Sequence, residues 1–161
     1  MLKPLEQFIC DTCGQVIEEP KHGWLEWEIE RNEGEMRSHA HNFRIVHHYS
    51  HSPYKETNKD GCYVSVTPSL HLQDFLGNRG VIQQLSLIDE GPIFYTAGAQ
   101  PRIKDIREWV ELFRRTHIPY YEEARQYFAD AQSDGYFDGL NQIAVYSENI
   151  LIDIISKYGQ S

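Results

Sequence analysis

Two cysteines near the start of the chain have the spacing of a metal-binding turn. Cys10 and Cys13 are separated by two residues and followed by Gly14, and short apolar segments lie on both sides. In such a turn two thiolates converge on one ion, and the glycine permits the tight backbone that brings them together. A pair of free cysteines without a metal is the alternative interpretation. If a metal is bound, the rest of the chain has to supply its other ligands.

Cys62, the third and last cysteine, is the first candidate for a further ligand. It follows the polar turn of residues 58–61, Asn-Lys-Asp-Gly, which can present a thiolate much as the Cys-x-x-Cys turn does. An odd number of cysteines in a chain without a signal peptide argues against a disulfide framework. The fourth ligand is then expected to be a histidine.

Five histidines lie in residues 39–51, and strand parity distinguishes between them. On a strand through residues 42–47, His47 shares the expected inward face with Phe43 and Ile45, whereas His48 falls on the outward face. We therefore predict a metal site formed by Cys10, Cys13, His47 and Cys62, with His48 and then His51 as substitutes for His47. Three thiolates and one imidazole complete a tetrahedral shell around Zn²⁺, so the predicted role of the metal is structural.

The Cys10-x-x-Cys13-Gly14 turn resembles the knuckle of zinc-ribbon and rubredoxin-like modules. Those modules usually supply the second ligand pair as another Cys-x-x-Cys, or as a Cys and a His close together, and this chain does neither. The resemblance covers at most residues 8–66 and implies a small, zinc-stabilised antiparallel sheet. It carries no implied activity.

The elements that position these ligands change in type near Pro68. Residues 24–30 place Leu25, Trp27 and Ile29 on one face and three glutamates on the other, which is typical of a half-buried strand. Residues 42–47 predict its hairpin partner, and residues 63–66 a short third strand. The loop between them, residues 51–61, is expected to be exposed.

Helical periodicity begins at Ser69 and continues to Tyr158. A first short helix is predicted to end at Gly77–Asn78, and a second has Val81, Ile82, Leu85 and Ile88 on its apolar face. Further helical patterns cover residues 103–113, 120–131 and 140–158. We expect an α+β fold, with a zinc-ribbon-like antiparallel sheet in residues 1–67 and an α-helical part in residues 68–161 packed on it.

The charge of the chain limits its expected partners. Fifteen basic against twenty-four acidic residues give a net charge of -9, which disfavours nucleic acid and anionic lipid. The basic residues Arg102, Lys104, Arg107, Arg114 and Arg115 alternate with acidic ones, as on a solvated helix face. No segment is apolar for long enough to span a membrane, and the expected location is the cytoplasm.

Tyrosines crowd the last third of the chain, and residues such as Tyr120 and Tyr121 are expected on its surface, where tyrosine favours protein contacts. We therefore expect a non-enzymatic, zinc-stabilised interaction or regulatory protein that acts on a protein partner. Two alternatives stay open. One is a nucleic-acid-binding zinc-ribbon regulator, and the other is a metal-dependent hydrolase with an open site formed by His39, His41, His48 and His51.

Overall fold

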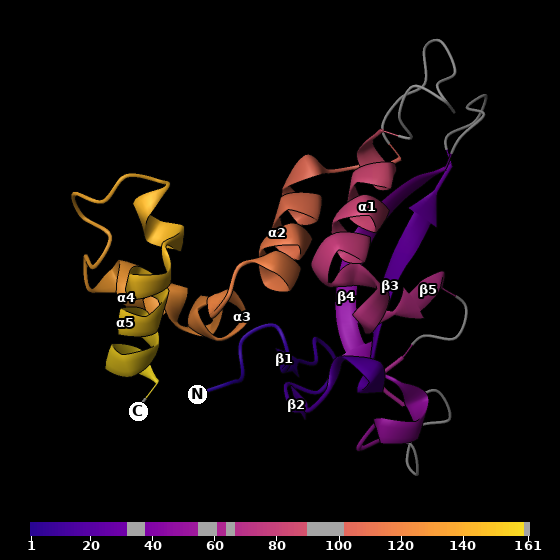
Figure 1. The fold of residues 1–161 in the computed structure, drawn as a ribbon, viewed down its shortest axis with the longest axis horizontal. Coiled ribbons are helices and arrows are strands. Elements are labelled where there is room, and N and C mark those ends of the chain that lie inside the picture. The colour runs from indigo at the N-terminus through magenta and orange to yellow at the C-terminus, as the bar shows by residue number, and fades with distance from the viewer. Residues whose placement is uncertain (32–37, 55–60, 64–66, 90–101, 160–161) are drawn as a thin grey trace.

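The computed structural model of the chain describes residues 1–31, 38–54, 61–63, 67–89 and 102–159. The strands are β1 (Phe8–Ile9), β2 (Val16–Ile17), β3 (Gly23–Glu30), β4 (His39–His47) and β5 (Ser69–His71). The α-helices are α1 (Gly77–Ile88), α2 (Ile106–His117), α3 (Tyr121–Ala124), α4 (Phe128–Ser133) and α5 (Glu148–Tyr158). Strands precede helices along the chain, which confirms the predicted α+β class (Figure 1).

The main sheet has three antiparallel strands in the order β4-β3-β5, and β1 pairs with β2 in a separate small sheet. The predicted hairpin between the two long strands is confirmed, with Leu25 opposite Ile45. Both side chains are fully buried and form the centre of the core on this face. The register shifts between Glu26 and Glu28, so the alternation of faces is interrupted there. Ile29 is therefore exposed, although the pattern predicts it on the buried face.

Glu26 also departs from its predicted place on a solvated face. Its side chain is buried and pairs with Arg44, which lies opposite it on β4. The Thr67 hydroxyl lies 3.4 Å from the same carboxylate. A carboxylate removed from water needs such partners, because an unpaired buried charge is costly.

The third strand of the sheet, β5, lies where the sequence pattern predicts the start of a helix. His71 on β5 is opposite Trp24 on β3, and the two rings stack with their centroids 4.4 Å apart. Pairing with β3 thus overrides the local helical pattern, which continues only as the short 3-10 helix Leu72–Phe75. Of the strand predicted at residues 63–66, Tyr63 is not in a strand and residues 64–66 lie outside the described part of the chain.

Helix α1 begins at Gly77, where the sequence predicts a helix end, and its buried face differs from the predicted one. Ile82 is 70% exposed and Leu85 is 48% exposed. The helix instead buries Leu87 and Gln84, and the Gln84 side-chain amide donates a hydrogen bond to the Thr116 hydroxyl of α2 at 2.8 Å. Packing against α2 therefore selects a more polar face of α1 than the count of apolar residues indicates.

The described residues form two separate apolar cores. The sheet core includes Phe8, Cys10, Ile17, Leu25, Ile45, Cys62, Leu72, Phe75 and Leu112. The helical core is formed by Tyr121, Ala124, Leu151, Ile154 and Ile155, with half-buried aromatic rings packed around it. Figure 1 shows α4 and α5 to one side of the sheet, with α3 between them and α2.

The tyrosines of the last third belong mainly to the helical core. Tyr121 is only 3% exposed, so its predicted place on the surface is wrong, and Tyr120 is half-buried. Tyr121 packs edge-on against Phe128 and lies beside Tyr146. None of the described helices combines the length and the apolar character that crossing a membrane requires.

Candidate metal centre

Three segments far apart in the sequence bring Cys10, Cys13, His47 and Cys62 together. One ligand atom from each of the four lies within 4.8 Å of the others, so the cluster can hold a metal ion. Cys10, His47 and Cys62 are buried, Cys13 is partly exposed, and all three cysteines are free thiols. Within the described ranges, this is the one group of three or more His, Cys, Asp or Glu side chains with such close ligand atoms.

The turn that carries the first two cysteines has the tight geometry that its glycine predicts. The pairing of Phe8 with Ile17 in β1 and β2 closes the base of this turn. Inside it, the Gly14 N–H donates to the Cys10 carbonyl at 2.8 Å, and Gly14 has a φ of 71°. This left-handed conformation favours glycine, which explains why Gly14 follows Cys13 directly.

His47 reaches the cluster from the end of β4, and its ring is held in a defined orientation. Its Nδ1 lies 3.5 Å from the Cys13 sulfur, and its Nε2 lies 3.2 Å from the Val16 carbonyl oxygen. With the Nε2 proton donated to that carbonyl, Nδ1 is the nitrogen that faces the sulfurs. Metal-ligating histidines are commonly fixed by such a bond from the second ring nitrogen.

The other two histidines considered for the fourth ligand point elsewhere. His48 stacks on Trp24 with ring centroids 5.1 Å apart, and His51 stacks on His22 at 3.7 Å. Consecutive residues on a strand point to opposite faces, so His47 reaches the cluster and His48 does not, as predicted. His51 lies beyond the strand, in a short 3-10 helix (Tyr49–His51).

Cys62 is positioned by contacts that sequence reasoning did not identify. Its sulfur lies 3.0 Å from the Ser52 hydroxyl, and its carbonyl accepts a hydrogen bond from Thr12 at 2.8 Å. Gly61 has a φ of 65°, and a Cβ added there would lie 2.9 Å from Ser52. Ser52 is buried although the loop that contains it is predicted to be exposed, while residues 55–60 of that loop lie outside the described ranges.

The four groups influence one another's protonation. Burial raises the pKa of the Cys10 thiol, but hydrogen bonds from His47 and from backbone N–H groups outweigh it and bring this pKa down to about 6. Burial opposes a charged His47, yet the bond to Cys10 raises the His47 pKa. Burial raises the pKa of Cys62 to about 12 and also raises that of Cys13, and the negative charge on Cys10 adds to both effects. The lowered pKa of Cys10 and the raised pKa of His47 thus have a common cause in the contact between the two side chains.

The donor set fits a borderline-soft cation with tetrahedral coordination. Metal–sulfur and metal–nitrogen bonds of about 2.3 and 2.0 Å place neighbouring sulfur and nitrogen ligands roughly 3.5 Å apart. The observed separation between the Cys13 sulfur and His47 Nδ1 is 3.5 Å. A divalent cation at the centre would favour ionisation of all three thiols, which the neighbouring groups alone do not achieve.

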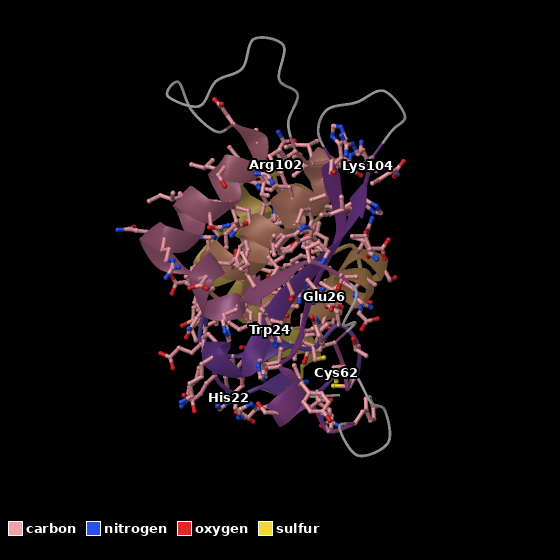
Figure 2. The ribbon with its side chains drawn as sticks, turned by 90° about the vertical axis from the view of Figure 1, so that its right-hand side faces the viewer. His22, Trp24, Glu26, Cys62, Arg102 and Lys104 are labelled. Carbon is pink, nitrogen blue, oxygen red and sulfur yellow. The ribbon has the colours of Figure 1, made fainter. Side chains whose placement is uncertain are left out.

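His39 and His41 lie at the opposite end of β4 from this cluster. His39 is opposite Glu30 in the register, and the His41 Nε2 lies 3.9 Å from the Glu30 carboxylate. At about 3.3 Å per residue along a strand, His41 is roughly 20 Å from His48. The Glu30 carboxylate also pairs with Lys104, and Figure 2 shows Lys104 and Cys62 near opposite ends of the sheet. The structure therefore does not bring His39, His41, His48 and His51 into one site.

Comparison of the chain with protein-family models, with curated protein sequences and with solved structures finds no match.

Proposed function

We propose that the chain binds one Zn²⁺ through Cys10, Cys13, His47 and Cys62, and that this ion has a structural role. The observation that carries the proposal is the convergence of three sulfurs and an oriented imidazole within 4.8 Å. Sulfur-rich tetrahedral sites suit zinc among the common cellular cations, whereas magnesium and calcium prefer oxygen. The zinc-ribbon resemblance of the Cys10–Cys13 turn supports the same choice.

A structural role follows from the composition of the shell. Four protein ligands complete a tetrahedron and leave no position for a substrate or an attacking water. The cluster ties the β1–β2 turn, the end of β4 and the turn at Cys62 to one point. Because β1 and β2 are only two residues long each, their own hydrogen bonds do little to hold that turn in place.

Neighbouring histidines provide a matched test of this assignment. His47→Ala should weaken Zn²⁺ binding by more than about a hundredfold. Removal of a ligand costs more affinity than removal of a residue that only hydrogen-bonds to a ligand. His48→Ala, one residue further on, should bind Zn²⁺ as the wild type does. When Co²⁺ replaces Zn²⁺, His47→Ala should alter the thiolate-to-cobalt charge-transfer absorption. His48→Ala should leave this absorption as in the wild type. Equal affinities for both variants would overturn the ligand assignment.

We further propose that the zinc-stabilised chain is a non-enzymatic interaction protein. The apolar surface that supports this is on α1, where Ile82 and Leu85 lie exposed on one side of the helix. The basic residues of α2 support nucleic-acid binding less well, because Arg115 is buried between carboxylates and Arg114 lies over the Tyr146 ring. The separation of the histidines along β4 likewise gives no support to the hydrolase alternative.

The α1 surface can be tested with a matched pair of variants. Affinity purification with the wild-type chain should recover a protein whose binding is lost in Ile82→Ser with Leu85→Ser. Asn78→Ser, at an exposed polar position of the same helix, should retain that protein. Binding that is unchanged in the double variant would exclude the α1 surface as the contact.

A further inference from the structure

A cluster of charged side chains joins the metal-binding turn to the helices. Arg115 of α2 is 5% exposed and lies between two carboxylates. Its Nη1 donates to Asp11 at 2.7 Å, and its Nε and Nη2 donate to the two oxygens of Glu122 at 2.7 and 2.9 Å. Arg125 completes the cluster, with bonds to Asp11 at 3.3 Å and to Glu122 at 3.0 Å. The bidentate pair with Glu122 is the geometry in which a buried ion pair is best compensated.

Asp11 connects this charged cluster directly to the ligands. It lies between Cys10 and Cys13, and its N–H donates to the Ile45 carbonyl at 2.8 Å. The Ile45 N–H in turn donates to the Asp11 Oδ2 at 2.7 Å, two residues before His47 on β4. The same carboxylate oxygen thus accepts from the strand that carries His47 and from Arg115. A change in the position of the Cys10–Cys13 turn would therefore change the Arg115 site as well.

The helices also hold the backbone on the other side of Cys10. Glu122 accepts a hydrogen bond from the Ile9 N–H at 2.9 Å, and Arg115 donates to the Ile9 carbonyl at 3.3 Å. Ile9 and Asp11 are the two immediate neighbours of Cys10. Through Arg115 and Glu122, helices α2 and α3 therefore contact the chain directly before and directly after a ligand.

Polar side chains join the N-terminal segment of the sheet core to α3 of the helical core. The apolar residues of the two cores form separate clusters. Besides the charged cluster, Glu123 of α3 accepts a bond from the Leu2 N–H, and its carboxylate lies 3.7 Å from the N-terminal amine. Polar interfaces between folded units are generally easier to open than apolar ones, because water can replace their partners.

We propose that metal occupancy controls the docking of the C-terminal helical unit, residues 121–158, onto the sheet, and that the Asp11–Arg115–Glu122–Arg125 cluster transmits this control. The inference rests on the proposed function, because it requires Zn²⁺ in the cysteine–histidine cluster. The ion fixes the Cys10–Cys13 turn and with it the Asp11 carboxylate that Arg115 and Arg125 bind. Since coupling between two sites is reciprocal, docking of the helices must also strengthen Zn²⁺ binding.

The test uses the full chain loaded with Zn²⁺ and substitutions that each remove one charge. Asp11→Asn keeps an oxygen for the Ile45 N–H but removes the charge that pairs with Arg115 and Arg125. Arg79→Gln, which removes the ion pair between exposed Arg79 of α1 and Asp74, is the control. We would measure the rate of Zn²⁺ release to a chromophoric chelator and the rate of hydrogen exchange in peptides from α3 and α5.

Asp11→Asn should accelerate Zn²⁺ release about tenfold and raise hydrogen exchange in α3 by a similar factor, while β3 stays protected. Arg79→Gln should change neither readout. Arg125→Gln, at the partly exposed edge of the cluster, should reproduce both effects more weakly. This variant replaces Asp11→Asn in the experiment if Asp11→Asn does not fold.

Two results would overturn the proposal. Faster exchange in α3 with Zn²⁺ release at the wild-type rate would show a merely structural ion cluster. Unchanged values for both readouts in Asp11→Asn and Arg125→Gln would show that the turn and the helices are independent. Either result leaves the zinc site itself intact, whereas a wild-type chain that takes up no Zn²⁺ would remove the proposed function and this inference together.

Discussion

The two cores of this molecule differ in what holds them together. The helical core is made of aromatic and aliphatic side chains, with Tyr121, Leu151 and Ile154 at its centre. The sheet core includes Cys10, in the turn between β1 and β2, and Cys62, and the strands β1 and β2 are only two residues long each. Apolar burial stabilises helices that present a continuous face, whereas short irregular segments gain more from a shared metal ion. With the proposed Zn²⁺ bound, this chain would use one solution in each core.

Removal of the metal should affect the sheet core most. We expect Cys62→Ser, or chelation of Zn²⁺ in the wild type, to lower the free energy of unfolding by on the order of 5 kcal/mol. For a chain of this size that corresponds to a fall in melting temperature of about 10–20 °C in scanning calorimetry. Chelator should have no additional effect on Cys62→Ser. Equal melting temperatures with and without chelator in the wild type would contradict the metal's role in this core.

Truncation inside the helical core should cost nearly as much but leave the metal in place. Ile154→Ala removes a fully buried side chain and should destabilise the protein by about 2–5 kcal/mol. Ile143→Ala, at a position that is 80% exposed, is the matched control and should cost less than about 0.5 kcal/mol. Chemical denaturation gives both values. Loss of bound Zn²⁺ from folded Ile154→Ala would show that the two cores are less distinct than described.

Acid should weaken the metal site, with a sign that follows from the thiol pKa values. Zn²⁺ binds deprotonated thiolates, and in the absence of metal Cys13 and Cys62 have raised pKa values, that of Cys62 being about 12. Each therefore releases a proton on binding between pH 6 and 8, whereas Cys10, with a pKa of about 6, is already largely ionised at pH 7. His47, whose pKa is raised by its contact with Cys10, releases a further proton wherever it is protonated in the absence of metal. Affinity should rise about tenfold per pH unit for each proton released. Competition titrations corrected for chelator protonation measure the slope, and an affinity independent of pH would contradict the assignment of these thiols.

Changes on the exposed side of α1 should have the smallest effect on stability. Ile82→Ser and Leu85→Ser remove apolar groups that neither core buries, so each should change the free energy of unfolding by less than about 0.5 kcal/mol. Chemical denaturation measures the free energy of unfolding of both variants and of Leu87→Ser, which alters a buried position of the same helix. A loss above 1 kcal/mol for Ile82→Ser would place that side chain in a core.

Local patterns were sufficient to predict part of this architecture and of the cluster. The Cys-x-x-Cys-Gly spacing, the alternation in β3 and the parity of His47 on β4 depend on neighbouring residues, and the structure has the turn, the strands and the inward His47. The cluster needs two long-range assumptions, namely that the end of β4 and Cys62 both return to the first turn.

The remaining features depend on contacts between distant segments, which a local pattern does not contain. Asp11 and Arg115 are 104 positions apart, and nothing in the Cys-x-x-Cys turn indicates its partner on α2. Residues 69–71 became a strand because β3 offers them a free edge. Gln84 is buried in place of Ile82 because Thr116 provides its amide with a hydrogen-bond partner.

Elemental analysis of the purified wild-type chain measures directly whether it binds zinc. The protein is expressed without added metal, passed through a desalting column and measured by plasma mass spectrometry against its amino-acid content. We expect close to one zinc per chain, and a substoichiometric value for His47→Ala but not for His48→Ala. A wild-type chain that contains no zinc, takes up none from buffered solution and still melts cooperatively would contradict this expectation.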